Sequence, residues 1–258
     1  MTKLKWTDTV GAPVTSTEAR LELAAVCRLV AREGMATIGG ARFATRDPQQ
    51  HGAYLANPGG MLLEEVSASK LIAVDRDGIR LDDGKGEPDS GALALVLAAL
   101  EARPSAVAAA QVTTTASCAV ASLQGGLAPI SQTAFMFHGA IGNHDWKPFT
   151  DAHSLRCQIA TEMAECPTQL VRGRGLLVTG KTLAQTWKYV FFLDKCCRAQ
   201  ISAMAISSAI GETLTIPPEE VIERTVKQSR AFIEHPRFVA DWPSFLDQLD
   251  REDTSFRA

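Results

Sequence analysis

The segment from Gly175 to Thr182, GLLVTGKT, matches every specified position of G-x-x-x-x-G-K-[ST], a pattern that binds nucleotide phosphates when a glycine-rich loop joins a strand to a helix. The four residues between the two glycines are Leu, Leu, Val and Thr, which favour a strand over a phosphate-binding loop. The preceding VRGRG is typical of a hairpin turn. We therefore predict a strand, a corner at Lys181 and a long helix, and no ATP site.

Cysteine chemistry has little support in the sequence. The six cysteines form no C-x-x-C pair and fall mostly within expected helices, which fits a reducing compartment. The adjacent Cys196 and Cys197 point to different helical faces, so at least one of them fills core. A reactive thiol would need an electropositive and partly exposed setting.

The composition excludes several classes of partner. The chain has 258 residues and is 46% hydrophobic, which suits one large α/β domain. Its 26 basic and 29 acidic residues give a charge of −3 with no basic block, so we expect no binding to nucleic acid or to an anionic membrane. No signal-like segment or apolar run of spanning length occurs. We expect a cytoplasmic protein.

The first half of the chain predicts two helices around short extended segments. The capping-box pattern from Thr15 to Glu18 begins a helix over residues 17–33, with Gly34 as its stop. Glycine- and proline-separated segments follow up to residue 84, and Asp77-Gly78 is a hairpin-turn signal. A second helix spans 89–103 and ends before Pro104.

The second half alternates strands and helices. A small-residue strand, AVAAAQVTTTAS, runs into a helical CAVASL; a helix over 151–166, the strand pair QLVRG and GLLVTG, a helix over 182–205 and a final helix from PPEEV follow. Helices then cover both faces of a central, mostly antiparallel sheet. We expect an α/β three-layer sandwich, with residues 1–16 as an N-terminal extension and 17–258 as a single domain.

This succession of segments resembles the class II aldolase/adducin family from about Glu18 to the end. The string RGRGLLVTGKT occupies the place of the family's NHGLLVVGKT, so the nucleotide-like match is incidental. EPDSG, PISQTAFMF and GNHDW are similar, in order, to other family segments. The resemblance implies the class II aldolase-like fold and a homo-oligomer with pockets at subunit interfaces.

The resemblance also implies that the family's metal chemistry is lost. Family enzymes hold a divalent metal with three histidines and use a Glu as acid and base; the corresponding positions here are Gln111, Thr113, Arg174 and Gly91. An amide, a hydroxyl and a guanidinium do not form a zinc site, because zinc selects thiolate, imidazole or carboxylate ligands. ARFATR and NPGG put Arg42 and Asn57 in the altered phosphate-contacting segments. We expect no metal and no cofactor.

Two functions stay open. In the first, the pocket performs metal-independent lyase, isomerase or cyclase chemistry on a small organic molecule, and the resemblance to unusual family members implies a role in specialised metabolism. Arg174 would stabilise an enolate or carboxylate, and His144 and His138 would serve as acid or base. The residues expected to bind the substrate are Gln111, Thr113, Ser90, Asn57 and Arg42.

In the second, the chain is a non-catalytic member that resembles the adducin head, with a relict pocket and a functional surface. His144 and Asp145 would then be a structural pair, and Arg174 a solvated turn residue. The polar character of the replacements, and the lack of an adducin-like tail in this sequence, favour the first alternative.

Overall fold

The computed structural model describes residues 11–35, 40–83, 86–145, 152–164 and 166–258, and a seven-stranded sheet forms its centre. The strand order is β3-β2-β1-β4-β7-β6-β5. Neighbouring strands are antiparallel except for β5 and β6, which confirms the mostly antiparallel sheet. The strands are β1 (Ala41–Arg46), β2 (Tyr54–Ala56), β3 (Ile72–Val74), β4 (Ala108–Val112), β5 (Ile141–His144), β6 (Thr168–Val171) and β7 (Gly175–Gly180).

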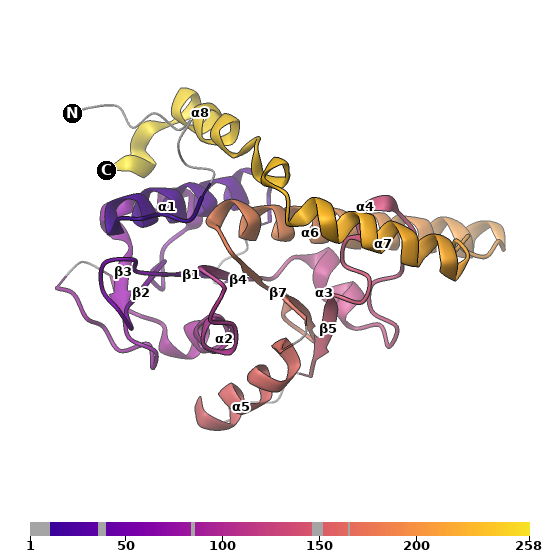
Figure 1. The fold of residues 1–258 in the computed structure, drawn as a ribbon, viewed down its shortest axis with the longest axis horizontal. Coiled ribbons are helices and arrows are strands. Elements are labelled where there is room, and N and C mark those ends of the chain that lie inside the picture. The colour runs from indigo at the N-terminus through magenta and orange to yellow at the C-terminus, as the bar shows by residue number, and fades with distance from the viewer. Residues whose placement is uncertain (1–10, 36–39, 84–85, 146–151, 165) are drawn as a thin grey trace.

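Helices cover both faces of the sheet, so the expected three-layer sandwich is confirmed. One large apolar cluster joins the sheet to α1, α3, α6 and α8, and a second joins its other face to α2 and α5. Figure 1 shows α1 and α6 on one side of the strands and α2 and α5 on the other. The helices are α1 (Ser16–Arg32), α2 (Ser90–Ala102), α3 (Thr115–Ala121), α4 (Gln132–Phe135), α5 (Ala152–Met163), α6 (Leu183–Ile210), α7 (Glu219–Ile233) and α8 (Trp242–Glu252), with 3-10 turns at Leu63–Glu65, Ala68–Lys70, Pro236–Val239 and Thr254–Arg257.

Strand β4 lies in the middle of the sheet and is buried along its whole length. Its alanines let helices approach closely from both sides. Ala108, Ala110 and Val112 belong to the cluster of α1 and α6, whereas Ala109 belongs to that of α2 and α5. Since side chains alternate along a strand, Gln111 lies on the α2 side.

Most helix boundaries follow local capping signals. The Thr15 capping box is present, with the Thr15 side chain accepting from the Glu18 amide and the Glu18 carboxylate accepting from the Thr15 amide. The strand expected through residue 117 ends at Val112, because Thr114 caps α3 and starts it three residues before the expected Cys118. Helix α6 continues five residues past the expected end, to a left-handed Gly211.

Two other expectations need adjustment at the C-terminal end and in α5. The helix that begins in PPEEV is not the last, because α8 follows it and packs on α1 (Figure 1). Helix α8 starts at D-W-P, which places a proline in its first turn, where proline is tolerated. This helix-start signal was not recognised in the sequence. Of the helix expected over 151–166, α5 covers Ala152–Met163, and residues 151 and 165 lie outside the described residues.

The nucleotide-like segment forms a strand and a helix cap. Residues 175–180 are β7, fully buried, and Thr182 caps α6 by accepting the Gln185 amide at 3.0 Å. Lys181 lies at the surface, where it pairs with Glu234. The expected strand, corner and long helix are confirmed.

Helix α6 is the longest helix, and only part of it packs against the sheet. Its last buried residue is Gln200, ten residues before its end. In Figure 1 the far end of α6 and the beginning of α7 extend beyond the sheet. No helix in the described part of the chain is apolar enough over a sufficient length to cross a membrane.

Candidate functional site

Three hydrogen bonds join the end of β4 to the turn between β6 and β7. The Gln111 Nε2 donates to the carbonyl oxygen of Arg174 at 2.9 Å and to Thr113 Oγ1 at 2.9 Å. Thr113 Oγ1 donates to the same carbonyl at 2.8 Å. The structure therefore brings together the three residues that the family resemblance places at the metal-ligand positions. Gln111 and Thr113 direct these donors to the backbone of Arg174 rather than to open space.

The turn itself is fixed by two glycines. Gly173 and Gly175 have φ angles of 72° and 90°, in the left-handed region that favours glycine. A Cβ atom on Gly175 would lie 2.4 Å from Ser117 Oγ and 2.6 Å from the Val112 carbonyl oxygen, so no larger residue fits. The Arg174 amide closes the turn by donating to the Val171 carbonyl at 2.9 Å. Arg174 thus projects from a rigid backbone.

A second arginine and an aspartate lie beside Arg174. Arg42 on β1 is the cross-strand neighbour of Gln111, is 6% exposed, and donates through Nη2 to Asp89 Oδ2 at 3.1 Å. Asp89 caps α2 by accepting the Ala92 amide at 3.0 Å. The two guanidinium groups and the single carboxylate of this group carry a net charge of +1, a balance that favours an added anion.

The charges of this group act on the pKa values of Arg174 and Asp89. Burial lowers the pKa of the half-buried Arg174; Asp89 raises it and Arg42 lowers it further. Burial acts to raise the pKa of Asp89, but the Ala92 amide and the two arginines outweigh it, so this pKa is lowered. Asp89 is therefore a carboxylate at neutral pH and a weak base.

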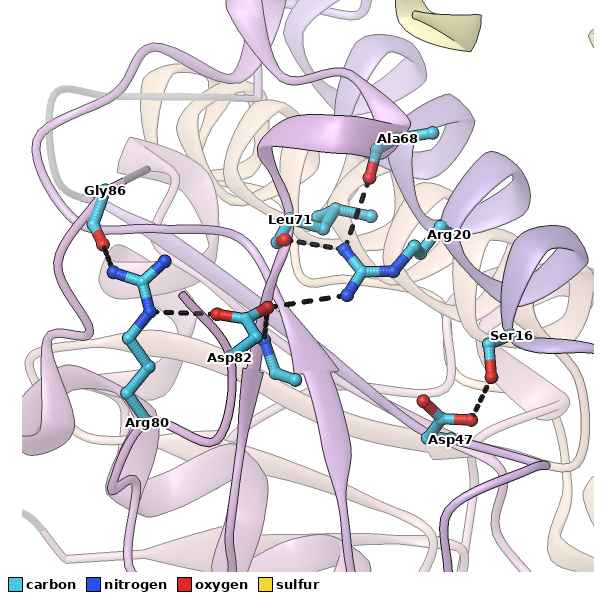
Figure 2. Close-up of polar contacts among 9 residues, drawn as sticks. Ser16, Arg20, Asp47, Ala68, Leu71, Arg80, Asp82 and Gly86 are labelled. Carbon is cyan, nitrogen blue, oxygen red and sulfur yellow. Dashed lines mark hydrogen bonds and ion pairs between the residues drawn. The ribbon is translucent and has the colours of Figure 1, made fainter. Parts of the chain in front are cut away.

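The segment that leads to Asp89 is anchored by an ionic network, drawn in Figure 2. Arg80 donates to Asp82 Oδ1 at 2.8 Å and also to the Gly86 carbonyl. The other oxygen of Asp82 faces Arg20 of α1 at 3.5 Å. These contacts tie the segment that precedes Asp89 to α1.

Ser90 and Asn57 lie next to this charged group, but their side chains form hydrogen bonds to the protein backbone. Ser90 Oγ donates to the Gly78 carbonyl at 3.0 Å and so holds the turn before α2. Asn57 is 1% exposed, and its Oδ1 accepts the Phe43 amide at 2.8 Å. The geometry gives both residues a supporting role beside Arg42 and Asp89.

His144 lies three strands from β4, on the edge strand β5. It is 2% exposed, and its Nδ1 lies 2.5 Å from Glu162 Oε2 of α5. The neighbouring Asp145 pairs instead with Arg172 at 2.7 Å. His144 and Asp145 are thus each satisfied by a different partner, and no contact within the described residues links His144 to the Arg42–Asp89 pair.

His138 lies elsewhere. It follows α4 and lines two adjoining hollows of about 160 Å³ and 380 Å³. The larger hollow is bounded by α7, including Glu223, Lys227 and Arg230. Because α4 and α7 pack on the α6 side, His138 is separated by the sheet from Gln111 and α2.

The donor set at the turn does not fit a divalent metal. Gln111, Thr113 and Arg174 offer an amide, a hydroxyl and a cation, and the first two are bonded to a carbonyl. Across the ranges that the structure describes, no three His, Cys, Asp or Glu side chains gather as a metal site.

Asp89 and Glu162 are the site residues that sequence reasoning missed. Asp89 had a local signal, since D-S-G-A precedes an apolar helix and Asp is a preferred N-cap. Glu162 had none, because it meets His144 only through the packing of α5 on β5.

The arrangement of this sheet, its two helical layers and the β4–β7 turn defines a class II aldolase fold. The family model for the class II aldolase and adducin N-terminal domain matches residues 21–201, and the chain belongs to this family. An aldolase II superfamily protein from Pseudomonas syringae superposes with a TM-score of 0.88 at 28% identity, covering 96% of this chain and 98% of that one. L-fuculose 1-phosphate aldolase from Glaciozyma antarctica PI12 superposes with a TM-score of 0.78 at 22% identity, covering 94% and 92%, and shows the fold alone.

The sequence relatives include both putative class 2 aldolases and adducins. The "Putative aldolase class 2 protein" of Caulobacter vibrioides is 27% identical over 93% of this chain and 91% of its own length. Human gamma-adducin is 26% identical over 72% of this chain, which spans only 27% of that protein. The similarity to full-length relatives is therefore on the aldolase side, and the adducin similarity is confined to one part of a larger protein.

Proposed function

We propose that this chain binds a small organic anion, carboxylate or enolate, beside Arg174 and acts on it as a metal-independent enzyme. The observation that carries the proposal is the fixed position of Arg174. Two left-handed glycines and the bonds from Gln111 and Thr113 hold its backbone, and its guanidinium is half-buried beside Arg42 and Asp89. A partly desolvated cation on a fixed backbone is the kind of group that stabilises developing negative charge.

An unused donor next to Arg174 supports the same proposal. The Nε of Arg42 is buried and forms no hydrogen bond to any residue that the structure describes. A buried guanidinium nitrogen without an acceptor costs free energy, and an anion would supply the acceptor. Family chemistry points to a carbon-skeleton reaction, lyase, isomerase or cyclase, in which the arginines would stabilise an enolate without a metal.

In a single copy of the chain, the three groups considered for proton transfer are poorly placed or weakly basic. His144 is committed to Glu162, His138 lies across the sheet, and Asp89 is a weak base. We therefore expect the acid or base to come from a second copy of the chain, with pockets at subunit interfaces in a cytoplasmic homo-oligomer.

A non-catalytic, adducin-like binding or assembly protein is the second candidate. It is favoured by the same hydrogen bonds, because Gln111 and Thr113 use their donors on the Arg174 backbone and not on a ligand. On this alternative the Arg174 turn is only scaffold, and the protein would act through its surface.

Binding to Arg174 variants separates the two candidates. We expect oxalate, malonate, pyruvate or benzoate to stabilise the wild-type chain in thermal-shift and calorimetric titrations. Arg174→Ala should weaken binding by roughly 10- to 150-fold, the equivalent of about 1.5–3 kcal/mol for a charge-assisted hydrogen bond, and Arg174→Lys should weaken it less. Both variants should unfold near the wild-type temperature.

Turnover is then followed by proton NMR with the acids that bind. A large fall in the melting temperature of Arg174→Ala, with ligand binding unchanged in the folded fraction, would contradict an anion site at Arg174. Binding without any change of the bound acid would leave the adducin-like candidate as the better description.

A further inference from the structure

The free end of α6 is an exposed helix without a charge. Between Ala199 and Gly211 the sequence has no Asp, Glu, Lys or Arg. Ile206 and Ile210 are 61% and 60% exposed, and Ile201 and Met204 are exposed as well. Apolar side chains therefore point outward around the helix instead of forming one stripe against the body of the protein.

Within the described chain, the neighbouring helix does not cover this surface. Helix α7 packs on α4 instead, through Ile222 and Val226 against Phe135. The last ten residues of α6 include no buried one. An isolated helical segment of this length is marginal in water, and a helix that is apolar all round is normally buried by another element. Large exposed apolar patches mark interaction sites.

The charges that follow α6 are divided along the chain. The segment 212–223, which begins at the free end, contains four glutamates and no basic residue. The next segment, 224–230, contains Arg224, Lys227 and Arg230 and no acidic residue. Arg230 lies toward the body of the protein, where its Nη2 faces the Gly139 carbonyl at 3.4 Å. The acidic segment 212–223 thus lies at the free end of α6, and the basic segment 224–230 leads back toward the body of the protein.

We propose that this arm, residues 199–230, binds the same arm of a second copy of the chain about a two-fold axis. In an antiparallel arrangement the acidic segment 212–223 of one copy lies against the basic segment 224–230 of its partner. The two-fold symmetry makes this contact twice. The uncharged end of α6 then becomes the apolar centre of the contact. A second copy of the chain matches both charged segments at once, whereas a uniformly acidic or uniformly basic partner would match one segment and oppose the other.

The helix dipole also contributes to the charge division. Acidic residues at the start of a helix and basic residues at its end are favoured by the helix dipole, and α7 follows that rule. The dipole gives no reason for exposed isoleucines on α6. The exposed isoleucines of α6 therefore form the contact, and the charges orient the two copies.

The first test compares substitutions of exposed isoleucines in the arm with one outside it, at positions of nearly equal accessibility. The wild-type chain should sediment as an oligomer, above its monomer mass of 27.7 kDa. Ile206→Glu with Ile210→Glu should reduce the mass at least two-fold in the micromolar range. The control Ile79→Glu, at a site that is 62% exposed and distant in sequence, should keep the wild-type mass. Circular dichroism checks that each variant is folded.

The second test asks whether the partner is another copy in this orientation. Lys227→Glu with Arg230→Glu, and separately Glu219→Lys with Glu220→Lys, should each weaken association, and mixing the two variants should restore it. A wild-type monomer, an unchanged mass in the isoleucine variant, or no recovery on mixing would overturn the proposal. A monomer that instead floats with phosphatidylcholine vesicles would assign the arm to a lipid surface.

Discussion

The side-chain nitrogen of Gln111 lies 2.9 Å from the carbonyl oxygen of Arg174, so a side chain of the central strand holds the backbone of the β6–β7 turn. Thr113 bonds to the same carbonyl oxygen at 2.8 Å. The family resemblance places a metal at the point where these residues meet. Here a hydrogen-bonded bridge joins the strand and the turn instead, and the side chain beyond that bridge is a cation.

This bridge predicts that Gln111 stabilises the fold. Gln111→Ala leaves the partly buried carbonyl of Arg174 with one donor fewer and removes the donor to Thr113, so the free energy of unfolding should fall by about 1–3 kcal/mol. Thr113→Val should cost a similar amount. Urea denaturation of both single variants and the double variant gives the coupling. Additive losses would show that the two side chains do not act as one unit.

The two turn glycines should differ in their tolerance of a methyl group. Gly175→Ala puts a Cβ 2.6 Å from a backbone oxygen as well as imposing a positive φ, so it should cost about 3 kcal/mol or more. Gly173→Ala has the positive φ with nothing within 4 Å of the new atom, and should cost about 1 kcal/mol. Thermal unfolding of the pair measures the difference. Equal losses would mean that the turn relaxes away from Ser117.

Lys181 and Thr182 should behave as a surface residue and a helix cap. Lys181→Ala should change the free energy of unfolding by no more than about 0.5 kcal/mol, because its ion pair with Glu234 is exposed. Thr182→Ala should cost about 1 kcal/mol through the lost cap of α6. We expect no ATP binding by the wild type or by either variant. A micromolar ATP signal lost in Lys181→Ala would contradict the strand-and-cap interpretation.

Glu22 predicts a pH dependence of stability. This carboxyl of α1 is 1% exposed beside Trp242 of α8; burial, and secondarily the charge of Glu18, raise its pKa from 4.5 to about 8. The folded state thus retains a proton that the unfolded state releases above pH 4.5. The free energy of unfolding should fall as pH rises from about 4.5 to about 8, by up to about 1.4 kcal/mol per unit, and then level off.

Glu22→Gln removes this titration. It should resemble the wild type near pH 4.5 and be the more stable protein at pH 8.5, as measured by urea denaturation at both values. The exposed Glu64→Gln is the matched control and should leave the pH dependence intact. Parallel pH curves for Glu22→Gln and the wild type would place the ionisation of Glu22 in its ordinary range.

The sequence by itself determined most of the helices and strands and their order, with α8 as an exception. Capping residues such as Thr15, the alanine-rich strand β4 and the glycines of the β6–β7 turn act over a few residues, so local pattern was sufficient to place them. The family resemblance places an amide, a hydroxyl and a guanidinium at the three ligand positions, and this assignment stays a prediction. The end of α6 was predicted too early, because that end makes no buried contact from which periodicity arises.

Only the tertiary structure decided which side chains work together. Gln111 and Thr113 point at the carbonyl of Arg174 because β4 and β7 are adjacent in the sheet, and Asp89 reaches Arg42 because α2 begins over β1. His144 and His138 were grouped with Arg174 in the sequence. The sheet separates His138 from it, and the packing of α5 commits His144 to Glu162. Contacts between residues 18 to 63 positions apart depend on register and layer packing, which no local pattern encodes.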